Sequence, residues 1–174
     1  MLSGRGEVAV SYDALQTMTP QLKKIISGGQ TGADMGGLLA ARELGIEPGG
    51  TAPKGWLTEN GPEEALLRSF GLTECEEEGF PPRTRRNVSN SSGTLLVGKY
   101  ETGGSRLTFQ VATQLNKPLF LVAFGNFSNV QEFQRWLEEH QIQVLNVAGN
   151  RESQSPGIAE FTRQFLLKSL LPSS

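Results

Sequence analysis

Short apolar runs alternate with longer stretches of helical periodicity along most of the chain. Ile25 and Ile26 run directly into a glycine-rich turn, and the apolar positions from Ala33 to Leu44 then recur at helical spacing before Gly45. This spacing predicts a buried strand, a tight turn and an amphipathic helix, with glycine as the left-handed residue that ends the helix. The periodic part of the chain therefore begins with a strand, turn and helix unit.

The same order of strand and helix returns in the second half of the chain. Strands are predicted over residues 93–97, 118–124 and 143–147, and helices over residues 107–115, 130–140 and 157–171. The stretch from residue 47 to residue 90 is less periodic and predicts a short strand near 50–52 and a helix near 62–70. In the helix over 130–140, Phe133, Trp136 and Leu137 lie on one face, which favours a place in the core.

Apolar strands that alternate with helices predict a parallel sheet, because each crossover helix returns the chain to the same end of the sheet. We therefore expect an α/β fold of three layers, with a mostly parallel sheet flanked by helices. The 174 residues suit one domain. We expect a single ligand-binding domain over residues 23–172, preceded by an N-terminal tail over residues 1–22 without the apolar stretch of a secretory signal.

Composition argues against several classes of function. Sixteen Lys and Arg against eighteen Asp and Glu give a formal net charge of −2, so no overall positive field draws the protein to nucleic acid or anionic lipid. No apolar run approaches the ~18 residues of a membrane span. One cysteine and one histidine are too few for a structural zinc site, which takes about four such ligands. We expect a cytoplasmic protein that binds neither nucleic acid nor membrane.

Three glycine-bearing polar loops, over residues 28–34, 103–108 and 149–153, each follow a predicted strand. Ligands of parallel α/β sheets bind at the carboxyl ends of the strands, so we expect the loops to converge on one ligand. Their glycines bring backbone N–H groups close to a ligand at the start of a helix, where an anion is favoured. The spacing of Gly28, Gly29 and Gly32 matches neither the dinucleotide fingerprint nor the P-loop. A phosphate-bearing ligand is predicted.

Several polar side chains near these loops have two interpretations each. Asp34 either stabilises the N-terminus of its helix or contacts ligand, and Ser105 caps its helix, donates to phosphate, or does both. Lys54 is either a surface cation or a partner for an anion. Arg151 either pairs in solvent with its neighbour Glu152 or reaches a ligand in the same cleft.

Arg83, Arg85 and Arg86 follow an acidic run that contains four glutamates between residues 74 and 78. Arginines and glutamates in this order can pair with one another in solvent. Alternatively, Arg83 and Asn87 lie four residues apart and share one face of any helix here, so both can reach a phosphorylated or planar ligand.

Nothing in these loops predicts a nucleophile. No His, Cys or Lys in them is paired with an orienting acid, so no catalytic constellation can be assembled. The sequence predicts a binding site, with no catalytic residue and no metal-ligating residue.

Blocks of residues along the chain form an ordered series. The series runs Ile25-Ile26-Ser27-Gly28-Gly29-Gln30-Thr31-Gly32-Ala33-Asp34, Pro53-Lys54-Gly55, Arg83-Thr84 with Asn87-Val88, Gly93-Thr94-Leu95, Gly103-Gly104 with Leu107-Thr108, Asn146-Val147-Ala148-Gly149, and Arg151-Glu152-Ser153 with Pro156-Gly157-Ile158. From about Lys23 to Leu170, this series resembles the molybdenum carrier family, that is, the molybdenum cofactor carrier proteins. The order of the blocks is more specific than any single loop.

The resemblance implies a Rossmann-like fold, related to the lysine decarboxylase-like superfamily, in a homo-oligomer of two or four chains. It implies binding of the molybdenum cofactor (molybdopterin), a pterin with a phosphate and a dithiolene that holds molybdenum, for protected storage or transfer to molybdenum enzymes or an insertase. Whether bare molybdate also binds stays open. Together, loops and resemblance predict these cofactor-binding residues: Gly28, Gly29, Gln30, Thr31, Gly32, Asp34, Lys54, Gly55, Arg83, Asn87, Gly103, Gly104, Ser105, Thr108, Gly149, Arg151, Glu152 and Ser153.

The chain departs from the family pattern at Met35, Arg86 and Asn90, where a basic, an aromatic and an acidic residue are expected. The related phosphoribohydrolases carry a catalytic Glu on the helix after a Gly-Gly loop, whereas residues 106–116 contain no acidic residue. This departure argues against nucleotide hydrolysis of that type.

Two functions from different classes remain open at this point. The first is a carrier that binds the cofactor without catalysis. The second is an enzyme that processes a nucleotide or a related phosphoester in the same cleft, with Asp34 or Glu152 as acid or base. A module that senses a nucleotide is a third and less attractive hypothesis, because no effector domain is attached.

Overall fold

A six-stranded parallel sheet forms the centre of the computed structural model, which describes residues 22–172. Residues 1–21 of the predicted tail lie outside the described residues. The strands of this sheet stand in the order β5-β2-β1-β8-β6-β7. Their bounds are β1 (Lys24–Ile26), β2 (Glu47–Ala52), β5 (Leu72–Glu74), β6 (Gly93–Val97), β7 (Leu119–Val122) and β8 (Val144–Gly149). A separate antiparallel pair, β3 (Leu57–Thr58) and β4 (Gly61–Pro62), forms a small hairpin.

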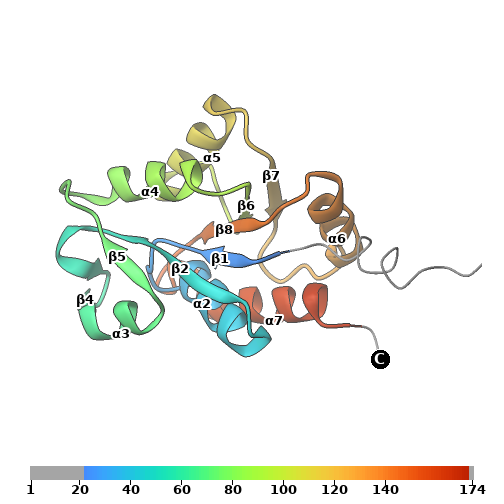
Figure 1. The fold of residues 1–174 in the computed structure, drawn as a ribbon, viewed down its shortest axis with the longest axis horizontal. Helices are drawn as coiled ribbons and strands as arrows, with labels where there is room; N and C mark the ends of the chain where they lie inside the picture. Colours follow the sequence, from blue (N-terminus) through green and yellow to red (C-terminus); the bar gives the residue numbers. More distant parts are fainter. Residues whose placement is uncertain (1–21, 173–174) are drawn as a thin grey trace, which may run out of the picture.

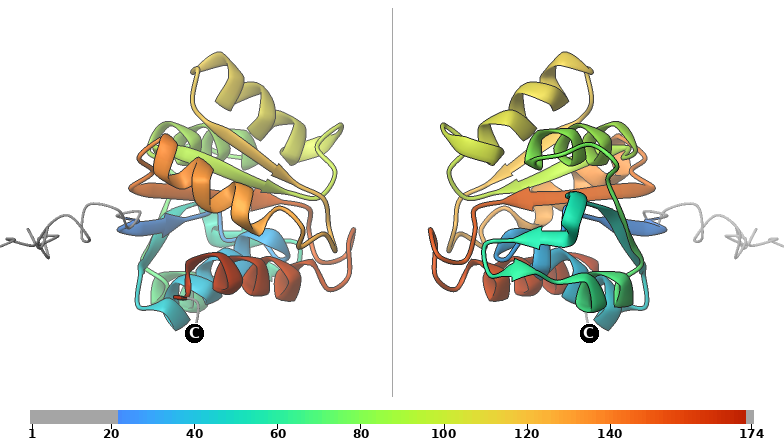
Figure 2. Two further views of the ribbon diagram at one scale, coloured as in Figure 1. Left: turned by 90° about the vertical axis from the view of Figure 1, so that its right-hand side faces the viewer. Right: turned by 90° about the vertical axis from the view of Figure 1, so that its left-hand side faces the viewer.

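Helices cover both faces of the sheet (Figure 1). They are α2 (Ala33–Leu44), α3 (Glu64–Ser69), α4 (Phe80–Ser89), α5 (Gly103–Gln114), α6 (Val130–Glu139) and α7 (Ile158–Leu170), with a short 3₁₀ turn η1 (Lys54–Trp56). On one face α7 packs against both α2 and α6, and on the other α4 packs against α5 (Figures 1 and 2). The predicted three-layer α/β fold is confirmed, and its arrangement is Rossmann-like.

The larger core lies between the sheet and the helices α2, α6 and α7. As predicted, Phe133, Trp136 and Leu137 of α6 are buried, and the Phe120 ring on β7 lies 5.2 Å from Phe133 and 5.6 Å from Trp136 between ring centroids. Burying such side chains contributes about 1.5–3 kcal/mol each. A smaller buried cluster joins Leu67 of α3 to Ala52 of β2 and Leu72 of β5.

Strongly periodic segments were predicted more accurately than the middle of the chain. The predicted bounds of α2 and β6 match the structure, but α5 begins at Gly103, four residues before the predicted start. The sequence analysis missed β5 and the β3–β4 hairpin, whose strands span two or three residues and are too short to show a period. The predicted strand near 50–52 begins three residues earlier, at Glu47, because residues 47–49 pair with β1 before the pairing with β5 starts at Gly50.

Strand order places the three glycine-bearing loops together. The chain runs outward from β1 through β2 to β5, crosses to β6 and β7, and returns as β8 between β1 and β6. The loops after β1, β8 and β6 therefore leave neighbouring strands at the same edge, where the direction of winding reverses. Such a switch point is the usual ligand position in an open parallel sheet.

Candidate functional site

A cleft of about 680 Å³ opens at the carboxyl edge of β1, β8 and β6. The loops after all three strands and the first turn of α4 contribute to its walls. Nine of the predicted site residues line it: Gln30, Asp34, Arg83, Gly103, Gly104, Ser105, Thr108, Gly149 and Arg151. The structure therefore brings these residues from all three loops and from α4 to one cleft, and their contact with a ligand stays a prediction.

Gly32 allows the loop after β1 to touch the loop after β8. Its φ of 81° lies in the region that favours glycine. A methyl group on Gly32 would lie 2.7 Å from the backbone nitrogen of Glu152 and would collide with the carbonyl of Asn150. Beside it, the Ala33 N–H donates to the Asn150 carbonyl at 3.1 Å. Any side chain at position 32 would force these two loops apart.

Asn150 joins the loop after β8 to the loop after β6. Its Oδ1 accepts the Lys99 N–H and its Nδ2 donates to the Lys99 carbonyl, both at 2.8 Å. The same amide lies 3.4 Å from the Ser105 hydroxyl. Sequence reasoning missed Asn150, although it follows Gly149 inside a predicted loop and an amide both donates and accepts.

A buried carboxylate and a guanidinium face each other across the cleft. Asp34 stands in the first turn of α2, is 4% exposed, and accepts the Gln30 N–H on Oδ2 at 3.2 Å. Nη1 of Arg83, which projects from α4, lies 3.9 Å from the same oxygen. A methyl group on Gly28 would lie 2.7 Å from the Arg83 Cζ, so only glycine lets the guanidinium reach this position.

Burial disfavours the charged form of both members of this pair. It raises the pKa of Asp34 above 3.8, against the opposing effects of Arg83, of the Gln30 and Gly28 N–H groups and of Arg151. Burial also lowers the pKa of the Arg83 guanidinium, Asp34 opposes this, and the charge of Arg151 adds to it. The physical cause is the loss of hydration, which disfavours any charged form.

The remaining groups of the cleft favour an anion. Lys99 and Arg151 line it beside Arg83. The helices α2 and α5 both begin at the cleft, and the dipole at a helix N-terminus attracts negative charge. The centroid of the Phe80 ring lies 5.5 Å from the Arg83 Cζ and 5.2 Å from the Arg151 Cζ. The cleft thus carries three cations and two helix N-termini against one carboxylate among the described residues.

Two residues that line the cleft each have a buried side-chain donor without a protein partner among residues 22–172. These donors are the Nε2 of Gln30 and the Nε of Arg83. A buried donor without an acceptor costs about 1–3 kcal/mol, so an acceptor supplied by a ligand or water would recover free energy here.

Comparison with known proteins agrees with this geometry. Residues 25–170 match the circularly permutated YpsA SLOG family. The chain belongs to this family. It is also similar to the crystal structure of a "Putative molybdenum carrier protein" from Syntrophus aciditrophicus, with a TM-score of 0.81 and 36% identity over 90% of this chain and 99% of that one. Among curated proteins, none matches the sequence significantly.

The resemblance to molybdenum carriers and the relation to the lysine decarboxylase-like superfamily are both confirmed. SLOG proteins are lysine decarboxylase-like, and the solved relative is named as a molybdenum carrier. The family match extends over the strands and loops that build the cleft.

Five of the predicted site residues of this SLOG protein lie outside the cleft, on the opposite side of the loop that follows β1. Gly29, Thr31, Gly32, Glu152 and Ser153 line a second hollow of about 430 Å³. Glu59, which sequence analysis missed, accepts the Thr31 and Ser153 hydroxyls and the Ser153 N–H. These hydrogen bonds lower the pKa of Glu59 below 4.5. The carboxylate therefore holds the loop after β1 against the loop after β8.

Glu152 is occupied at the start of α7. One oxygen of its carboxylate accepts the Gly157 N–H at 2.5 Å and the other accepts the Ala159 N–H at 3.0 Å. This contact caps two of the free N–H groups at the helix N-terminus. The sequence analysis considered Glu152 as an acid or base of a nucleotide-processing enzyme. In the structure, both oxygens of this carboxylate instead accept hydrogen bonds at the start of α7.

The other predicted residues stand outside the lining of the cleft. Lys54 Nζ lies 3.7 Å from Glu78, and the Gly55 N–H donates to Glu74. Arg83 and Asn87 share α4, but the buried Asn87 amide bonds the Thr51 N–H at 2.8 Å and its carbonyl at 3.0 Å. Asn87 therefore ties α4 to β2, whereas Arg83 reaches the cleft. Gly28 contributes through the space that it leaves for Arg83.

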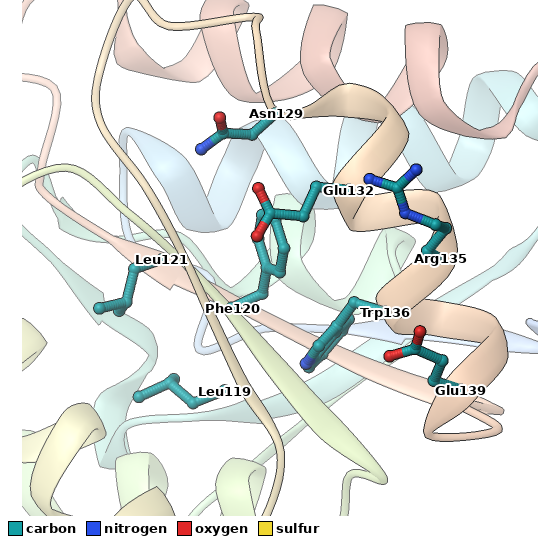
Figure 3. A pocket seen from close by; sticks show the side chains of 8 residues that line it. All are labelled: Leu119, Phe120, Leu121, Asn129, Glu132, Arg135, Trp136 and Glu139. Carbon is teal, nitrogen blue, oxygen red and sulfur yellow. The ribbon is translucent and has the colours of Figure 1, made fainter.

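A third hollow, of about 490 Å³, lies between β7 and α6 at the far edge of the sheet (Figure 3). Its lining combines Phe120 and Trp136 with Glu132, Arg135 and Glu139, and includes none of the predicted site residues. Within residues 22–172, no cluster of three or more His, Cys, Asp or Glu could hold a metal ion. No helix in that range is long and apolar enough to cross a membrane.

Proposed function

We propose that this SLOG protein is a carrier that binds the molybdenum cofactor, a phosphorylated pterin, in the cleft at the carboxyl edge of β1, β8 and β6. The observation that carries the proposal is the convergence of three cations and two helix N-termini on one cleft of about 680 Å³. This volume is within the roughly 300–1,000 Å³ of small-molecule sites. The name of the solved relative, a molybdenum carrier, supports a molybdenum-containing cargo.

The residues present fit a phosphorylated ring. The N–H groups at the start of α5, around Gly103 to Ser105, together with Lys99 and Arg151, would hold the phosphate. The Arg83 guanidinium, whose Nε is unpartnered among residues 22–172, would donate to acceptors on the ring. The dithiolene of the cofactor supplies ligands to molybdenum, so the chain needs to bind only the pterin and phosphate.

Direct titration with intact cofactor under anoxic conditions tests this proposal. We expect saturable uptake and slower oxidative decay of the bound cofactor. Replacing Arg151 with Gln removes a charge-assisted hydrogen bond, worth about 1.5–3 kcal/mol, and should weaken binding about tenfold or more. The matched control is Arg86→Gln, because Arg86 pairs with Glu77 at 3.7 Å and does not line the cleft.

The proposal fails if the cofactor shows no saturable uptake while a nucleoside monophosphate binds well. Equal losses in the Arg151 and Arg86 variants would also contradict it, because a general loss of positive charge would then explain both.

A nucleotide-processing enzyme is the second candidate, and the burial of Asp34 in the cleft favours it. A carboxyl group with a raised pKa is a common general acid or base. Incubation with nucleoside monophosphates, followed by detection of released base or sugar phosphate, decides between the two functions. Turnover that disappears in Asp34→Asn would establish the enzyme, and absence of product with intact cofactor binding would leave the carrier.

A further inference from the structure

Asp34 is the feature of the cleft that phosphate binding does not explain. Among the described residues that line the cleft, it is the one carboxylate, beside Arg83, Lys99 and Arg151. A buried negative charge repels phosphate and is costly to remove from water. An anion site alone would be stronger with a neutral residue at this position.

The Asp34 carboxylate keeps acceptor capacity for a ligand. The Gln30 N–H donates to Oδ2 at 3.2 Å, and the Gly28 N–H faces the same group. Arg83 stands 3.9 Å away, beyond hydrogen-bond range. An ionised carboxylate has about four acceptor positions, so roughly half of them remain for donors on a bound molecule.

Resting on the proposed function and deepening it, we propose that Asp34 sets the specificity of the cleft by accepting hydrogen bonds from a 2-amino-4-oxo ring. This ring edge, in which a ring N–H stands between an amino group and a carbonyl, is shared by pterins and guanine. Its adjacent N–H and NH₂ donors match the two oxygens of one carboxylate.

Donors for the acceptor side of this ring lie beside Asp34. The carbonyl and neighbouring ring nitrogen of guanine or a pterin both accept hydrogen bonds. Arg83, whose Nη1 lies 3.9 Å from the Asp34 carboxylate and whose Nε lacks a protein partner among residues 22–172, supplies donors in the same part of the cleft. An adenine-type edge instead has an unprotonated ring nitrogen, whose lone pair the carboxylate would repel.

Calorimetric titration of the full chain with GMP, IMP, AMP and inorganic phosphate tests this assignment. IMP differs from GMP only by the absent 2-amino group. One hydrogen bond to a charged acceptor contributes about 1.5–3 kcal/mol, so GMP should bind at least about tenfold more tightly than IMP, and AMP more weakly still.

Asp34→Asn separates ring recognition from a purely structural role. In this variant the ratio of GMP affinity to IMP affinity should fall to about two or less, because a neutral amide accepts weakly and places NH₂ donors against the donors of the ring. Affinity for inorganic phosphate should stay the same or rise, since a negative charge has been removed. Arg86→Gln should leave the ratio unchanged.

Three results would overturn the assignment. The first is equal binding of GMP and IMP by the wild type, a comparison that needs no variant to fold. The second is absence of GMP binding. The third is an equal loss of phosphate and GMP affinity in a folded Asp34→Asn protein, which would show that Asp34 only positions Arg83.

The outcomes for ring recognition and for the carrier function are distinguishable. Discrimination of GMP from IMP without uptake of the molybdenum cofactor would retain the role of Asp34 and reject the cargo. Saturable uptake of the cofactor without that discrimination would retain the carrier and reject the role of Asp34.

Discussion

Gly32→Ala should strongly destabilise the protein, because two loops meet where the new methyl group would stand. The φ of 81° is strained for any residue with a side chain, which costs about 1–3 kcal/mol. The methyl group would also lie 2.7 Å from the Glu152 nitrogen. The backbone on both sides is held by the Ala33 to Asn150 hydrogen bond, so relaxation must break contacts between the loops. We expect a total of about 3 kcal/mol or more.

Thermal unfolding followed by circular dichroism measures this loss. For a protein of this size, 1 kcal/mol corresponds to about 2–4 °C, so Tm should fall by roughly 6–12 °C. Gly104→Ala is the matched control, because a methyl group there meets nothing within 4 Å and alanine favours the helix. Its Tm should stay the same or rise slightly. If Gly32→Ala melts within about 2 °C of the wild type, the described contact between the loops is wrong.

Three further predictions concern other residues of the site. Asn87→Ala leaves two buried backbone groups of Thr51 without partners and should cost about 2–4 kcal/mol in urea unfolding, with GMP affinity unchanged in the folded fraction. Glu59→Gln should reduce stability at neutral pH. Because the pKa of Glu59 is lowered in the folded protein, the ionised carboxylate stabilises the fold at pH values above its unfolded-state pKa. The difference in unfolding free energy between wild type and variant should therefore vanish as pH falls through the folded-state pKa. The ratio of GMP to IMP affinity should be highest above the raised pKa of Asp34 and decline as pH falls through it, because a protonated carboxyl group is a weaker acceptor and places an O–H donor against the ring; a ratio independent of pH would contradict this.

Local patterns were sufficient for most of the fold. Periodicity and glycine positions are properties of neighbouring residues, so α2 and β6 could be predicted with their bounds. The less periodic middle of the chain was harder. In α4, prolines at positions 81 and 82 occupy the first turn, where their missing N–H groups cost nothing, but a Pro-Pro pair does not by itself predict a helix.

Sequence by itself determined that parallel strands alternate with helices and that three glycine-bearing loops leave the same edge of the sheet. The tertiary structure alone decided on which side of these loops each side chain lies. Asp34 and Arg151 line the cleft, whereas Thr31 and Ser153, from the same two loops, bind Glu59 on the other side. The physical reason is that a side chain's direction depends on the element packed against it, and these partners are far apart in the chain.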